Sequence, residues 1–157
     1  MISLLWVAIT LLTFILQGSI SIFDVTPNFA AILTYYAGIR KGEIKGMFFG
    51  ALLGIIQDSL SGTFIGPNLL SKGLIGYLSS SVYSRFFMWT PLLGMITLFL
   101  VTSLDSTVVF ISRSFFDRMP VGIGSAAFII IVQSLLNAPL GILLKPKEYA
   151  QGRAEKS

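Results

Sequence analysis

The sequence contains no cysteine and no histidine, and only 11% of its residues are charged. Without the first two residue types the chain has no disulfide, no thiol nucleophile and none of the commonest ligands for zinc, haem or iron–sulfur clusters. A soluble domain usually carries about 25% charged residues to cover its surface. We therefore expect no metal and no other cofactor, and a chain whose main solvent is not water.

Residue sets that carry catalysis are also missing. We find no phosphate-cradling loop, no serine placed beside a base and no pair of carboxylates on one helix. The net charge of +4 does not indicate nucleic acid binding, because long apolar stretches separate the basic residues and no basic stripe forms. The sequence therefore predicts a protein that is not an enzyme and does not bind nucleic acid.

Apolar segments fill most of the chain, since 54% of the residues are hydrophobic. A helix needs roughly 20 apolar residues to cross the hydrocarbon core of a bilayer. We predict an all-α integral membrane protein with about six transmembrane helices in one domain, residues 1–144, and a short cytoplasmic tail, residues 145–157. The predicted spans are residues 2–23, 29–39, 46–60, 67–82, 91–111 and 121–144.

Two features of these spans leave alternatives open. The first span is apolar like a signal peptide, but no basic residue precedes it and no small-residue cleavage pair follows, so we expect a retained helix. The second and third spans are short. They either cross fully or form one re-entrant hairpin, in which case the count falls to four crossings.

The basic residues predict the orientation, because lysine and arginine in short loops stay in the cytoplasm. With both termini inside, the cytoplasmic segments hold eight basic residues and the outer loops hold only Arg113 and Arg118. The basic loop Arg40, Lys41 and Lys45 belongs to the inner set. It either only orients the chain or also contacts anionic lipid, at about 1 kcal/mol per basic residue.

Glycines recur every four residues at Gly42, Gly46, Gly50 and Gly54. Residues four apart lie on one face of a helix, and in lipid such small residues allow another helix to approach closely. This face either contacts another helix of the same chain or receives a partner protein. A second small-residue region contains Gly73 and Gly76, and the same two interpretations apply to it.

Polar residues inside the predicted spans are candidates for buried contacts. Asp58 ends the third span, near Asn68 and Lys72 of the fourth, and a carboxylate at that depth costs a few kcal/mol without water or a partner. We expect it to pair with Lys72 or with the exposed amides of a helix N-terminus. Alternatively, Asp58, Asn68 and Lys72 line an outward-facing pocket for a small polar ligand.

Three further polar residues lie within the last two spans. Asp105 is flanked by serines and threonines, and we expect it to face protein and not lipid. Gln133 and Asn137 are four residues apart on one face, where they can form hydrogen bonds between helices. Isolated carboxylates without histidine give little support to a proton pathway.

The segment from Pro27 to Tyr83 carries a series of short motifs. Pro27 precedes an apolar run, followed by YAGIRKG at 36–42, GxxxGxxxGIIQD at 46–58, SGxxxGxN at 61–68 and GxxGY at 73–77. This series resembles the MreD family of bacterial rod shape-determining membrane proteins. The rest of the chain agrees with that family in length and hydropathy.

This resemblance implies a non-enzymatic scaffold subunit of the cell-elongation (rod) complex in the inner membrane. Its implied partners are MreC and, through it, MreB, RodA and the elongation transpeptidase, together with membrane lipid. The glycine face of the third span, or the small face of the fourth, would receive the single membrane helix of MreC.

The same resemblance implies a fold like that of the six-helix substrate-binding subunit of energy-coupling-factor vitamin importers. Capture of a vitamin for import is therefore the alternative function. Such a subunit needs a pocket that a longer outer loop usually covers. The first two outer links here are short, which favours the scaffold.

Overall fold

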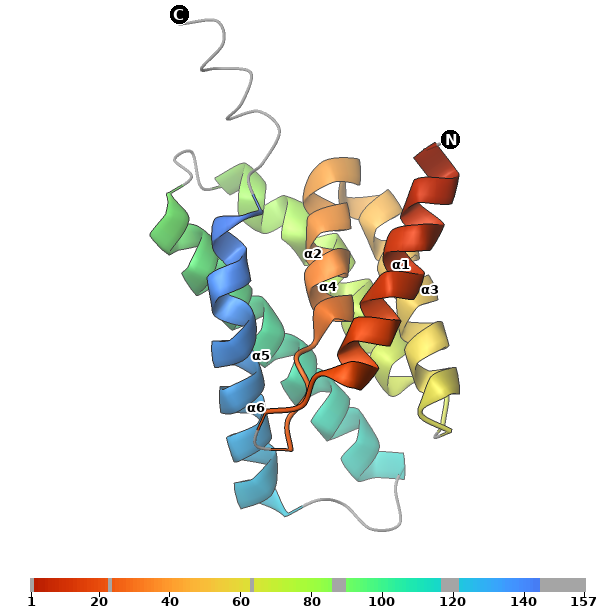
Figure 1. The fold of residues 1–157 in the computed structure, drawn as a ribbon, viewed down its shortest axis with the longest axis vertical. Coiled ribbons are helices and arrows are strands. Elements are labelled where there is room, and N and C mark those ends of the chain that lie inside the picture. Colours follow the sequence, from red (N-terminus) through yellow and green to blue (C-terminus); the bar gives the residue numbers. More distant parts are fainter. Residues whose placement is uncertain (1, 23, 63, 86–89, 117–121, 145–157) are drawn as a thin grey trace, which may run out of the picture.

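Six helices that alternate in direction build the protein (Figure 1). The computed structural model describes residues 2–22, 24–62, 64–85, 90–116 and 122–144. The helices are α1 (Ile2–Ser19), α2 (Phe29–Lys41), α3 (Glu43–Leu60), α4 (Pro67–Arg85), α5 (Pro91–Phe116) and α6 (Ile123–Asn137), followed by the short 3-10 helix η1 (Ala138–Ile142). The prediction of an all-α chain with six helices is confirmed.

Several predicted ends were wrong, for local reasons. The first helix ends at Ser19 and not at residue 23, because Ile22 and Val25 pair their backbones across a turn that holds Asp24 at φ 59°. The α-helical part of the last span ends at Asn137, before Pro139, whose ring cannot continue an α-helix. The predicted tail, residues 145–157, lies outside the described residues.

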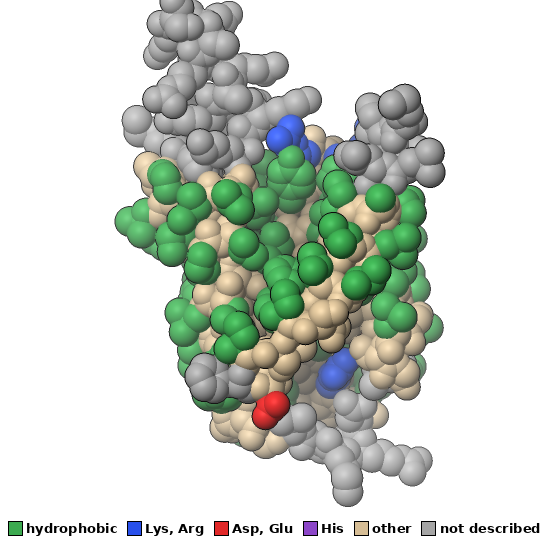
Figure 2. Space-filling model, in the orientation of Figure 1, with side chains coloured by type: hydrophobic (Ala, Val, Ile, Leu, Met, Phe, Trp, Pro, Cys, Tyr) green, Lys and Arg blue, Asp and Glu red, His purple; other side chains and the backbone are tan. Residues whose placement is uncertain are grey.

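The described surface is rich in large apolar side chains, and the interior contains charged side chains, which is unusual for a soluble protein. Large apolar side chains such as Leu11 (60% exposed) and Leu100 (60%) lie outside, while Lys72 and Asp105 are fully buried. Figure 2 shows hydrophobic side chains over the middle of one face and charged ones toward its two ends. By length and hydropathy, two helices, Pro91–Phe116 and Ile123–Ile142, could cross a membrane.

The closest helix contact joins α3 to α4. A Cβ built on Gly46, Gly50 or Gly54 would lie closer than 3.0 Å to backbone atoms of α4, as would one built on Gly76 to backbone atoms of α3. Gly73 is different, because its nearest neighbour would be the Ala51 Cβ at 3.8 Å. Gly46, Gly50 and Gly54 thus form a seam with α4 inside the chain, whereas Gly42, expected on the same face, would meet nothing within 4 Å and is not part of it.

This seam corrects the docking hypothesis. Of the two interpretations of the glycine face of α3, contact with a helix of the same chain is confirmed, because α4 covers this face and leaves no room there for the membrane helix of a partner. Helix α2 reaches the same place, since a Cβ on Gly38 would lie 2.6 Å from the Gly76 carbonyl oxygen. A partner helix could contact this face only by displacing α4.

The basic loop is a tight helix connection. Gly42, with φ 86°, is the single residue between α2 and α3, a backbone conformation that glycine adopts without steric cost. The Lys41 Nζ lies 4.0 Å from the centre of the Trp6 ring, and the Arg40 guanidinium lies 5.0 Å from that of Tyr36. Both are contacts of a cation with a ring face, and the one between Lys41 and Trp6 joins the end of α2 to α1. Lipid binding by the loop stays a prediction.

Candidate functional site

A buried ion pair joins α4 to α5 at the centre of the molecule. The Lys72 Nζ lies 3.2 Å from the Asp105 Oδ2, and neither side chain has any exposed surface. Asp105 also accepts hydrogen bonds from the Asn28 amide and the Ser71 hydroxyl, while Lys72 donates to the Asn68 Oδ1 at 3.0 Å. Buried charges persist when their remaining hydrogen-bonding positions are satisfied, and here three helices or their caps supply the partners.

The expected pair of Asp58 with Lys72 was therefore wrong, because Asp105 takes the lysine. Asp58 instead follows the second expectation and accepts from amides at the N-terminus of α4: those of Gly66 (2.9 Å), Asn68 (3.1 Å) and Leu69 (3.2 Å). The Asn68 side chain adds a fourth bond of 2.7 Å. The negative charge thus sits where the helix dipole favours it.

Asn28 is a central residue that the sequence reading missed. It caps α2 by accepting from the Ala31 N–H at 3.1 Å, donates to Asp105, and its carbonyl accepts from the Asn137 side chain at 3.2 Å. An available signal was its place between Pro27 and an apolar run, since asparagine is a preferred N-cap residue.

Two polar side chains of α6 bind that helix to its neighbours. The Gln133 side chain donates to the Thr26 carbonyl at 2.7 Å and accepts from the Ser106 hydroxyl at 2.6 Å. Asn137 donates to the Thr102 hydroxyl at 3.2 Å. Both residues therefore form hydrogen bonds between segments, the role expected of them.

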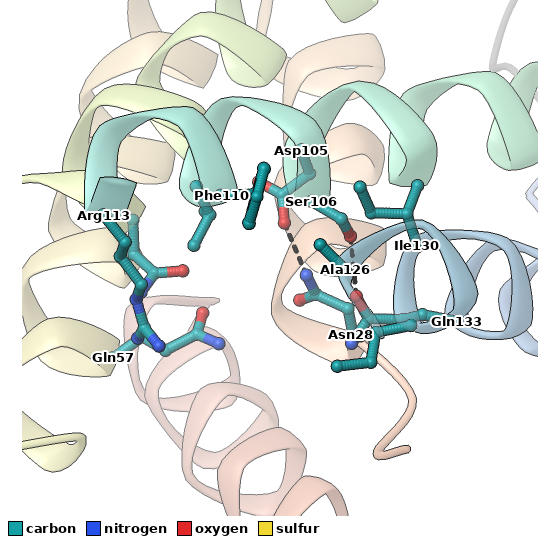
Figure 3. A pocket seen from close by; sticks show the side chains of 12 residues that line it. Asn28, Gln57, Asp105, Ser106, Phe110, Arg113, Ala126, Ile130 and Gln133 are labelled. Carbon is teal, nitrogen blue, oxygen red and sulfur yellow. Dashed lines mark hydrogen bonds between the residues drawn. The ribbon is translucent and has the colours of Figure 1, made fainter. Parts of the chain in front are cut away.

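A pocket of about 230 Å³ lies beside this network (Figure 3). Its lining includes Gln57 and Arg113, which lie in the last turns of α3 and α5. Its polar lining includes Asn28, Asn68, Asp105, Gln57 and Arg113. Of the three residues expected to line a pocket, only Asn68 does so.

Arg113 was predicted to begin a loop, but α5 continues to Phe116 and holds it in the wall of this pocket. Figure 3 shows it near Gln57, away from Asp105. The Arg113 Nε and the Gln57 Oε1 are buried and have no hydrogen-bond partner among the described residues. The pocket therefore contains an unmatched donor and an unmatched acceptor.

This arrangement can hold helices and a small ligand. The carboxylate of Asp105 is fully occupied by hydrogen bonds and its lysine. The described residues bring together no group of three side chains of the kinds that could hold a metal ion. The network thus locks α2, α4, α5 and α6, and the pocket is the open part of the site.

The comparisons with known proteins place the chain in a family. The family model described as rod shape-determining protein MreD matches residues 1–146, nearly the whole chain. No curated protein and no solved structure matches the sequence of this chain. The match extends well beyond the motifs at 27–83 and includes both helices that are apolar and long enough to cross a membrane. The chain therefore belongs to the MreD family of rod shape-determining proteins.

Proposed function

We propose that the chain is a non-enzymatic scaffold subunit of the cell-elongation complex. It crosses the bacterial inner membrane six times with both termini in the cytoplasm, and it acts with MreC and, through it, with MreB, RodA and the elongation transpeptidase. The observation that carries the proposal is the family match over residues 1–146. That match by itself identifies the chain as a member of a family of rod shape-determining proteins.

The buried network supports assembly over chemistry. Its charged and amide groups bond to one another and to helix backbones, so their hydrogen-bonding capacity is spent on holding helices together. A scaffold needs a rigid body of this kind to present its outer surfaces. Hydrogen bonds and an ion pair shared among several helices give such rigidity, although the Asn137 Oδ1 is buried without a partner among the described residues.

The pocket gives little support to vitamin import. Its volume of about 230 Å³ is below the roughly 300–1,000 Å³ of sites that enclose a whole small molecule. An importer subunit should bury most of its substrate. We therefore keep the scaffold as the proposed function.

Cell shape tests the proposal. In a rod-shaped bacterium whose own copy of this gene is depleted, cells should become round, and the chain should restore rods and co-purify with MreC. The double variant Lys72→Met/Asp105→Leu separates scaffold from chemistry, because it removes both charges together and leaves neither unpaired.

If the protein acts only as a scaffold, this double variant should reach the membrane in normal amounts and restore rods. Round cells containing a stable, MreC-bound double variant would show that the charges themselves perform a reaction or carry protons. A folded wild-type chain that does not co-purify with MreC would also contradict the proposal.

A further inference from the structure

The lining of the pocket next to the buried network contains one basic side chain without an acidic partner among the described residues. Its acidic residue, Asp105, is neutralised by Lys72 at 3.2 Å. Its basic residue, Arg113, makes no ion pair with any described residue, and its Nε has no hydrogen-bond partner among them. A buried guanidinium nitrogen without an acceptor costs free energy that a bound oxyanion would recover.

Another part of the pocket wall is apolar. It consists of Val109 and Phe110 of α5 with Ala126, Ile129 and Ile130 of α6. Ile129 is 40% exposed, so the wall continues from the pocket onto the outer surface of the helices. A ligand that fits both parts of the wall has a negatively charged polar end and an apolar chain.

The pocket is large enough for only one part of such a ligand. About 230 Å³ holds a polar group of headgroup size, because sites that enclose whole drug-sized ligands measure roughly 300–1,000 Å³. The apolar chain must then leave along α5 and α6, the two helices that are long and apolar enough to cross a membrane.

We propose that this pocket binds the phosphate-bearing polar end of an anionic lipid. Arg113 donates to a phosphate oxygen, and the Gln57 amide oxygen accepts from a hydroxyl of the same headgroup. The acyl chain lies against α5 and α6. The inference rests on the membrane location proposed above and is independent of the scaffold role.

Lipid binding to the purified full-length chain tests the proposal. The probes are phosphatidylglycerol, which carries both phosphate and hydroxyls, and phosphatidylcholine with the same acyl chains, compared by native mass spectrometry from detergent. The wild type should prefer phosphatidylglycerol by about tenfold, because phosphatidylcholine brings a choline cation close to Arg113 and has no headgroup hydroxyl that can donate to Gln57. Arg113→Gln should lose that preference while keeping the wild-type unfolding temperature.

Ser114→Ala is the matched control, because Ser114 is the exposed neighbour of Arg113 in α5 and is not part of the pocket lining. Its lipid preference should equal that of the wild type. If Arg113→Gln does not fold, Ala126→Leu replaces it, since a larger side chain on buried Ala126 occupies the pocket and should abolish the same preference.

The source of the phosphate is resolved by a competition arm. Soluble glycerol phosphate that displaces the lipid, and binds without it, would identify a free polyol phosphate as the ligand of the same site. Failure to compete identifies the lipid. The proposal is overturned if the wild type shows no preference, or if Ser114→Ala loses as much of it as Arg113→Gln. Round or rod-shaped cells have no bearing on this outcome.

Discussion

Lys72 is the largest side chain that is completely buried in the described part of the chain. A lysine within a membrane segment costs several kcal/mol unless it is paired, and this one has both oxygens of Asp105 within 3.4 Å and the side-chain Oδ1 of Asn68 at 3.0 Å. At the scale of single residues, the stability of the fold therefore depends on the pairing of Lys72 with Asp105.

Breaking that pair from one side should destabilise the protein strongly. Lys72→Met leaves Asp105 buried without its cation, and we expect a loss of about 3–5 kcal/mol in the free energy of unfolding. Thermal unfolding in detergent micelles measures it. Asp105→Leu should cost a similar amount, for the converse reason.

The double variant Lys72→Met/Asp105→Leu provides the comparison. Its loss should be much smaller than the sum of the two single losses, because neither charge is left alone. Additive losses would mean that the two side chains do not depend on each other.

The sequence indicated which residues would be buried and polar, but it did not indicate their partners. Asp58, Lys72 and Asp105 stand out because charges are rare in apolar segments. Lys72 was assigned to the nearer carboxylate, while its actual partner lies 33 residues away on another helix. Pairing at that separation is decided by how helices pack, which residue spacing alone does not encode.

The same limit applies to the pocket. Arg113 counted as an outer-loop charge, and its role emerged only because α5 runs five residues past the predicted end. Gln57 gave no signal of its own beyond preceding Asp58.

At the scale of helices, the contact between α3 and α4 brings two backbones together without side chains between them. Gly50 faces the Lys72 carbonyl oxygen directly. This contact also sets the position of Lys72, so the seam and the ion pair depend on the same stretch of α4.

Gly50→Ala should therefore force α3 and α4 apart. The added methyl group collides with backbone, which cannot move aside as a flexible side chain would, and we expect a loss of roughly 1–3 kcal/mol, typical of overpacking. Gly73→Ala is the control, because its Cβ meets Ala51 at an ordinary 3.8 Å. Thermal unfolding of the two variants should differ clearly, and equal stability would contradict the seam.

Helix existence followed from hydropathy, and helix ends did not. The third span was expected to begin at Gly46, but α3 begins at Glu43, where an acidic residue in the first turn favours helix formation. Charged residues had been assigned to the turn because they are polar. In the structure, Gly42 alone makes that turn, so Lys45 is already helical.

At the scale of the whole molecule, helix lengths bear on how the chain crosses the membrane. Helix α3 has 18 residues, or roughly 27 Å at 1.5 Å per residue, which is close to the thickness of about 30 Å of the hydrocarbon core. Helix α2 is shorter, with 13 residues, and the non-helical segment before it extends its path. The length of α3 therefore fits a full crossing, whereas α2 reaches that length only together with the segment before it.

Single cysteines test that topology cleanly, because the sequence contains none. With a membrane-impermeant maleimide, Ser61→Cys should react in intact cells whose outer membrane is opened. Lys45→Cys should react only after the inner membrane is permeabilised. Lys45→Cys that stays unreactive on both sides would indicate the re-entrant hairpin, and the reverse pattern would invert the orientation.

The distance along the chain between Lys72 and Asp105 matters during synthesis. The ribosome delivers the lysine 33 residues before its counter-ion, so in the six-crossing topology proposed above α4 would enter the bilayer before the carboxylate that pairs with its lysine. Until α5 follows, the nascent chain carries the full cost of an isolated intramembrane cation. When Asp105 arrives on α5 and pairs with Lys72, that cost is removed. Completion of α5 should therefore stabilise α4 in the membrane.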